Sequence, residues 1–103
     1  MAIFNLLAEC DKKEIDIDIL FTTVKSTGYK YIYIFPVLCY EHQELVGVGL
    51  TASGKDFLQM TEVKQELILL LGVLWDEGFV VTDLYTGHVV TIDNYKSVFS
   101  YFR

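Results

Sequence analysis

The segment from Leu67 to Trp75 constrains the fold of this chain more than any other part of it. It holds nine uncharged, almost wholly apolar residues in a row, inside a stretch that is otherwise acidic. On a helical wheel at about 100° per residue, five polar residues of 62–77 gather on one side: Glu62, Gln65, Glu66, Asp76 and Glu77. The apolar residues gather on the other side: Val63, Leu67, Leu70, Leu71, Leu74 and Trp75. The pattern predicts a helix over residues 62–77 with one face in a core.

Two apolar residues break this pattern. Leu69 and Val73 fall in the middle of the charged side, framed by carboxylates that include Glu62 and Glu66. An aliphatic pair at i and i+4 on an otherwise charged helix face indicates either a dent in the surface or half of an interface. We expect these four residues to belong to a partner-binding surface.

Composition bounds the domain organisation and the class of partner. The chain has 103 residues, of which 52% are apolar, so we expect one folded domain over residues 1–103 and no disorder. Its 14 acidic and 8 basic side chains give a formal charge of −6. Because such a field repels phosphate backbones and anionic membrane surfaces, the sequence disfavours direct binding to nucleic acid or membrane. A basic protein is the partner that this charge favours.

The first ten residues bear on localisation. They resemble a lipoprotein signal ending at Cys10, but no basic residue precedes the apolar stretch and Glu9 stands where a small residue is needed. The apolar run from Leu67 has about half the length that spans a bilayer. We therefore expect a cytoplasmic protein in which Cys10 and Cys39 are reduced thiols.

Residue patterns along the chain predict an α+β domain. Strands are expected at 2–8, 29–40 and 45–50, and a hairpin at 80–85 and 88–92 that turns at Thr86 and Gly87. The helix over 62–77 would begin after a Thr61 cap and end at Gly78, and Asp93 would cap a short closing helix. Residues 11–27 fit a helical stripe, although part of them alternates like a strand. The resulting fold is an antiparallel sheet of four or five strands with two or three helices packed on it.

A tyrosine-rich strand is the second candidate for a binding surface. Tyr29, Tyr31 and Tyr33 repeat at i, i+2 and would line one strand face at intervals of about 6.6–6.8 Å. Such a face is either part of the core or a partner-binding face, and the carboxylates Asp16 and Asp18 would help to steer a basic partner to it. Because both faces of the segment are apolar, we expect an internal strand, with a bulge or an unpaired position at Pro36.

Motifs for catalysis or ligand binding are incomplete. Gly49 to Lys55 has the spacing of a phosphate-binding loop, but Asp56 replaces the Ser or Thr that holds magnesium. The helix 62–77 and the following hairpin resemble a winged helix, yet the helix offers one Lys and one Gln against four carboxylates. His42 and His88 show no metal-ligand spacing. The sequence therefore predicts no catalytic residues, no metal site and no cofactor.

These observations predict a non-enzymatic protein-binding domain, in particular a small acidic inhibitor of a basic, nucleic-acid-acting protein. The chain is similar in size and acidity to bacterial toxin-immunity proteins and phage counter-defence proteins, a similarity of type that carries no shared motif. One alternative is a homo-oligomeric structural or accessory protein, such as a homodimer, in which Leu69 and Val73 pack against a symmetry mate. A second alternative is an enzyme or nucleotide binder with a site assembled from scattered residues.

Overall fold

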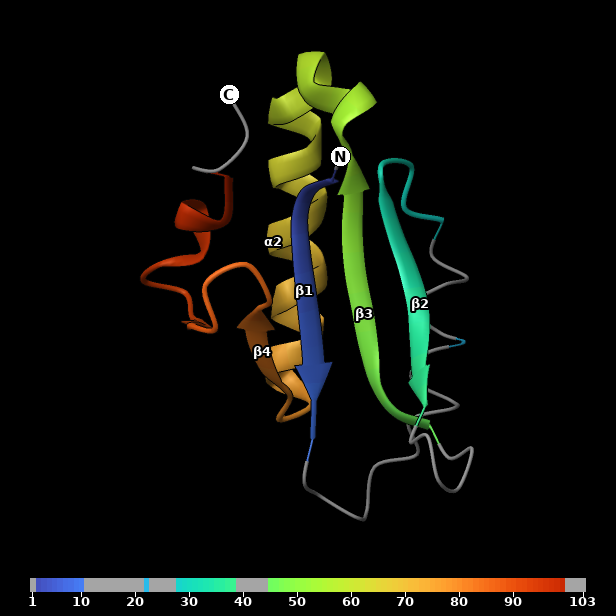
Figure 1. The fold of residues 1–103 in the computed structure, drawn as a ribbon, viewed down its shortest axis with the longest axis vertical. Helices are drawn as coiled ribbons and strands as arrows, with labels where there is room; N and C mark the ends of the chain where they lie inside the picture. Colours follow the sequence, from blue (N-terminus) through green and yellow to red (C-terminus); the bar gives the residue numbers. More distant parts are fainter. Residues whose placement is uncertain (1, 11–21, 23–27, 39–44, 100–103) are drawn as a thin grey trace.

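A computed structural model describes residues 2–10, 22, 28–38 and 45–99 of the chain (Figure 1). These residues form a five-stranded antiparallel sheet in the order β2-β3-β1-β4-β5. The strands are β1 (Ala2–Glu9), β2 (Ile32–Leu38), β3 (Leu45–Ser53), β4 (Val80–Asp83) and β5 (Val89–Val90). The helical elements are the α-helix α2 (Met60–Asp76) and the 3₁₀ turns η1 (Gly54–Gln59) and η2 (Tyr95–Phe99).

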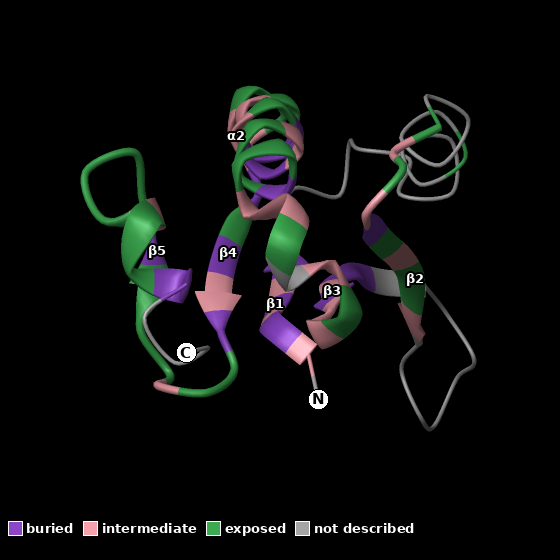
Figure 2. Cartoon of the chain, turned by 90° about the horizontal axis from the view of Figure 1, so that it is seen from above, coloured by how far each residue is buried: buried purple, intermediate pink, exposed green. Residues whose placement is uncertain are grey.

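The core lies between α2 and one face of this sheet (Figure 2). Strand β1 is central, with Leu6 opposite Leu50 of β3 and Ala8 opposite Val81 of β4. All four of these residues are fully buried. No described helix lies on the other side of the sheet, so within the described ranges the protein has two layers (Figure 2). The predicted α+β class and antiparallel sheet are confirmed.

Helix α2 follows the predicted wheel closely. Its buried residues are Val63, Leu67, Leu70, Leu71 and Leu74, and Trp75 is half-buried. The helix ends as predicted, because Gly78 has a φ of +88° and its N–H donates to the Trp75 carbonyl at 2.9 Å. The Phe79 N–H donates to the Leu74 carbonyl at 2.9 Å, and this pair of bonds defines a Schellman motif.

The predicted start of the helix is wrong. Gln59 is the N-cap residue, no side chain makes a capping hydrogen bond, and Thr61 lies within α2. The physical reason is that η1 runs directly into α2, so the helical turns begin before the residue whose hydroxyl could have capped them. As α2 is 17 residues long, no described helix meets the length and apolarity needed to cross a membrane.

The C-terminal part closes the core with a turn and not with an α-helix. Val98 and Phe99 of η2 are buried, and the Phe99 ring meets Phe4 edge to face with centroids 5.8 Å apart. Asn94, and not Asp93, stabilises the approach to this turn, since its Oδ1 accepts a hydrogen bond from the Thr91 N–H at 2.8 Å. The described elements are thus one bounded α-helix and two 3₁₀ turns, and the expected two or three helices are not matched. The helix expected at 11–27 falls largely outside the described residues.

Strand β2 is shorter than predicted and lies at the edge of the described sheet. It begins at Ile32, and among the described strands it pairs with β3 alone, so the described residues do not match the prediction of an internal strand. An edge position suits Pro36, which has no N–H to donate to a second neighbour. The irregularity that Pro36 implies is present one residue later, as a register shift between Val37 and Leu38.

The hairpin of β4 and β5 is confirmed, with a longer loop than predicted. Val81 pairs with Val90 across it. The loop spans residues 84–88 and includes Gly87, which has a φ of +76°. Asp83 organises this loop, because its Oδ1 accepts a hydrogen bond from the Tyr85 N–H at 2.9 Å.

Candidate functional site

The outer face of α2 carries the first candidate site. Leu69 is 67% exposed and Val73 is 41% exposed, so both lie where the helical wheel places them. Glu62 and Asp76 are exposed on the same helix. The core-facing residues of α2 are buried. Leu69 and Val73 are therefore exposed on a helix that already packs on a core.

A glycine lies beside these two residues in the middle of the helix. A Cβ added to Gly72 would meet nothing within 4 Å, so no described part of the chain requires a glycine there. In a helix interior glycine costs about 0.5–1 kcal/mol relative to alanine. Gly72 therefore leaves a shallow gap next to Leu69, three residues earlier, and exposes the helix backbone to close approach.

Glu66 has a role within the chain and is not a free carboxylate. Its Oε1 accepts hydrogen bonds from the backbone N–H groups of Tyr31 at 3.0 Å and Ile32 at 3.3 Å. Its Oε2 accepts one from the Lys30 N–H at 3.2 Å. The residue thus ties the start of β2 to α2, and sequence reasoning, which grouped it with partner-binding carboxylates, missed this contact because the two segments are far apart in the chain.

The three predicted tyrosines do not form one stripe. Strand β2 begins after Tyr31, so Tyr29 and Tyr31 precede it and pack, half-buried, against the core. Tyr33 is 66% exposed on β2. The Lys30 ammonium lies 5.4 Å from the centre of the Tyr31 ring. Asp16 and Asp18 lie outside the described residues.

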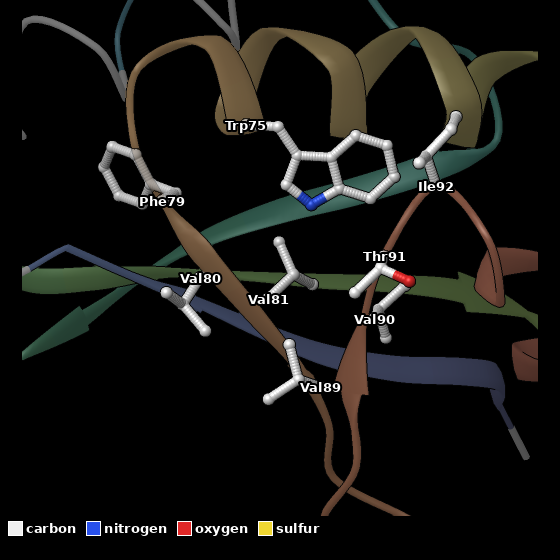
Figure 3. Close-up of a pocket in the computed structure, with 8 residues that line it drawn as sticks. All are labelled: Trp75, Phe79, Val80, Val81, Val89, Val90, Thr91 and Ile92. Carbon is white, nitrogen blue, oxygen red and sulfur yellow. The ribbon is translucent and has the colours of Figure 1, made fainter.

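An apolar pocket of about 360 Å³ opens beside the last turn of α2 (Figure 3). In Figure 3 the Trp75 indole lies over the hairpin, with Val81 and Val90 below it and Ile92 at its far end. The lining residues come from α2, the turn after it, the β4–β5 hairpin and the segment that follows: Trp75, Phe79, Val80, Val81, Val89, Val90, Thr91 and Ile92. Sequence reasoning did not identify this pocket, because its lining joins α2 to the hairpin and to the segment after it, which no periodicity connects.

Gly72 lies between the outer face of α2 and the pocket. Leu69, Gly72 and Trp75 are three residues apart in turn, so each step turns by about 60° around the helix, from the outer face at Leu69 to the pocket that Trp75 lines. Exposed carboxylates stand beside this apolar surface, at Asp76 next to Trp75 and at Asp93 next to Ile92. We call this set of residues the α2 surface. It is suited to an apolar anchor flanked by positive charge.

A second, polar pocket has a structural explanation. It measures about 170 Å³ and is lined by Asp83, Thr86, His88, Val89, Val90, Asn94 and Ser97. Several of its polar groups already serve the hairpin loop; for example, the Thr86 hydroxyl accepts a hydrogen bond from the His88 N–H at 3.2 Å. Among the described residues no cluster of three His, Cys, Asp or Glu side chains is placed to bind a metal ion.

The glycine-rich segment is not a phosphate loop. Gly49 to Ser53 belong to strand β3, and Gly54 and Lys55 start η1. The Lys55 N–H donates to the Ser53 hydroxyl at 3.2 Å, which makes this a local turn at the strand end.

No protein-family model matches the chain, and comparison with curated proteins and with solved structures gives no significant match.

Proposed function

We propose that this chain is a non-enzymatic binding domain that docks a basic protein on the α2 surface. The observation that carries the proposal is the exposure of Leu69 and Val73 among carboxylates, on a helix whose core-facing residues are already buried. Exposed apolar side chains ringed by polar ones are typical of protein interfaces, where a few such anchors supply most of the binding energy.

The charge of α2 supports a basic partner over a second copy of the same helix. Lys64 is the one basic residue of α2, and its ammonium lies 5.4 Å from the centre of the Phe99 ring, away from Leu69. Two α2 surfaces facing each other would therefore bring carboxylates together without cations to pair with them. A partner with Lys or Arg around an apolar side chain meets no such repulsion.

We further propose that the chain acts as an inhibitor of a basic protein that acts on nucleic acid. A protein that acts on nucleic acid presents positive charge to attract phosphates, and a negatively charged domain of net charge −6 is attracted to the same surface. An apolar side chain of the partner could then enter the pocket below Trp75. Binding of this kind would cover the phosphate-attracting surface of the partner.

The test compares two variants in affinity capture from a lysate of the native host. The double variant Leu69→Ser, Val73→Ser removes the apolar pair, and Leu58→Ser is the matched control, because Leu58 is 88% exposed on η1, outside the α2 surface. We expect a basic protein that is retained by the wild type and by the control and is lost from the double variant, with binding that weakens as salt rises. Equal retention by the double variant would place the interface elsewhere.

A further inference from the structure

The sheet face opposite α2 is a second surface, made of three rows of residues that run across the strands. The strand register places Phe35, Gly49, Leu7, Thr82 and Val89 in one row through all five strands. The flanking rows are Tyr33, Thr51 and Asn5 on one side and Val37, Gly47, Glu9 and Val80 on the other. We call these residues the open sheet face.

Large apolar side chains on the open sheet face are exposed. Four of them are exposed to solvent: Tyr33 and Phe35 on β2, Val80 on β4 and Val89 on β5. Even Leu7, in the middle of the central strand, is only half-buried. An antiparallel sheet with one solvated face normally carries polar side chains there. The middle row is mostly apolar, through Phe35, Leu7 and Val89, whereas Thr51, Asn5 and Glu9 lie in the flanking rows. Exposed apolar side chains gathered on one face in this way mark an interaction surface.

The charge of the open sheet face indicates what covers it. Glu9 is the one charged residue in the three rows, and it lies at the end of β1. A basic partner would find no set of carboxylates here, in contrast to the α2 surface. A second copy of this chain, in spite of its net charge of −6, would bring almost no like charge into contact at this face.

The size of the face fits a dimer of modest stability. The strands hold eight, seven, nine, four and two residues from β1 to β5. At about 4.8 Å between strands and about 3.3 Å per residue, they cover roughly 480 Å² in projection for each copy. Two copies bury about 1,000 Å² in total, which is the lower bound for a specific interface. We therefore expect a dimer that exchanges with the monomer.

We infer that two copies of this chain pack their open sheet faces together in a symmetric dimer. The contact is isologous, so the Phe35–Val89 row of one copy packs on the same face of the other, with the strands of the two sheets aligned to within about 30° or crossed at near right angles. The inference does not rest on the proposed function, because Leu69 and Val73 of α2 lie on the opposite side of the sheet and stay free in the dimer. Val80 and Val89 border both the pocket and the open sheet face, so the dimer covers one rim of the pocket.

Sedimentation velocity of the full chain over a wide concentration range tests the dimer. We expect a monomer–dimer equilibrium in the wild type that does not weaken as salt rises, since the contact is apolar. Tyr33→Lys and Val89→Lys, on the two edge strands, should each weaken dimerisation at least tenfold, because symmetry places two ammonium groups in the interface. Both positions are exposed, and circular dichroism checks that both variants fold.

The matched control is Leu69→Lys on the α2 surface, which should dimerise like the wild type. A wild type that stays monomeric at every concentration overturns the inference, and so does a dimer that Tyr33→Lys and Val89→Lys leave intact. A dimer lost only in Leu69→Lys would place the contact on α2, against both the inference and the charge argument. Capture of a foreign protein through Tyr33 by a monomeric wild type would assign the open sheet face to another occupant and would also overturn the inference.

Discussion

The ring of Phe35 fills the space in front of Gly49 on the neighbouring strand, where a Cβ at residue 49 would have to lie. The two residues are directly opposite each other in the β2–β3 register. The aromatic ring thereby packs on the backbone of β3, which only a glycine at that position permits.

Gly49→Ala should therefore destabilise the protein. The added methyl group would meet Phe35 Cε2, Cζ and Cδ2 and force the ring away from β3, and overpacking of this kind costs about 1–3 kcal/mol. Urea denaturation measures the change. Gly72→Ala is the control: its methyl group meets nothing within 4 Å, so we expect a gain of about 0.5–1 kcal/mol from helix propensity. A neutral Gly49→Ala would mean that Phe35 does not pack on β3.

The two sides of α2 should respond oppositely to truncation. Leu70→Ala and Leu74→Ala each empty a fully buried site and should cost about 2–5 kcal/mol in the free energy of unfolding. Leu69→Ser changes an exposed position and should stay within about 1 kcal/mol of the wild type. Chemical denaturation of the three variants gives the comparison. Similar losses for Leu69 and Leu70 would show that α2 is buried on all sides.

Glu66→Ala should loosen the start of β2. It removes the acceptor of the Lys30, Tyr31 and Ile32 N–H groups. Because these bonds are exposed or part-buried, water can replace the carboxylate, and we expect a loss of about 0.5–1.5 kcal/mol. Hydrogen exchange at these three amides should become faster. Glu62→Ala, at an exposed position of the same helix, should alter neither the stability nor the exchange. Unchanged exchange in Glu66→Ala would contradict the assigned contact.

Gly78→Ala tests the end of α2. The φ of +88° at this position is disfavoured for a residue with a Cβ, and we expect a loss of about 1–2 kcal/mol in thermal or chemical unfolding. Gly72→Ala serves again as the reference, because the same added methyl group should there raise stability. The opposite signs of the two effects would separate backbone strain from helix propensity.

The parts of the fold that could be predicted from the sequence are those set by local periodicity. The buried face of α2, the exposure of Leu69 and the Gly78 ending all follow from residues within a few turns of one another. The prediction of a Thr61 cap was wrong, because the helical turns of η1 begin before Thr61, although the capping signal was also local.

The rest depends on pairing between distant segments. The edge position of β2, the Glu66 contact with Tyr31 and the pocket below Trp75 each join parts of the chain that no periodicity connects. The prediction of a tyrosine stripe was wrong for the same reason, since the pairing of β2 with β3 decides where β2 begins. For the candidate site, the sequence located the apolar pair on α2, whereas the pocket required the hairpin to be placed against the helix.

The central position of β1 has a consequence for how the chain acquires its structure. Leu6 of β1 pairs with Leu50 on one side and with Asp83 on the other, so both partners come from much later in the sequence. Helix α2 and β4, in contrast, are joined by a short turn and can associate early. Because contacts between distant segments close slowly, the pairing of β1 with β3 and β4 is expected to form after the local contact of α2 with β4. The middle of the sheet is therefore expected to be completed last, although it holds some of the most deeply buried residues of the protein.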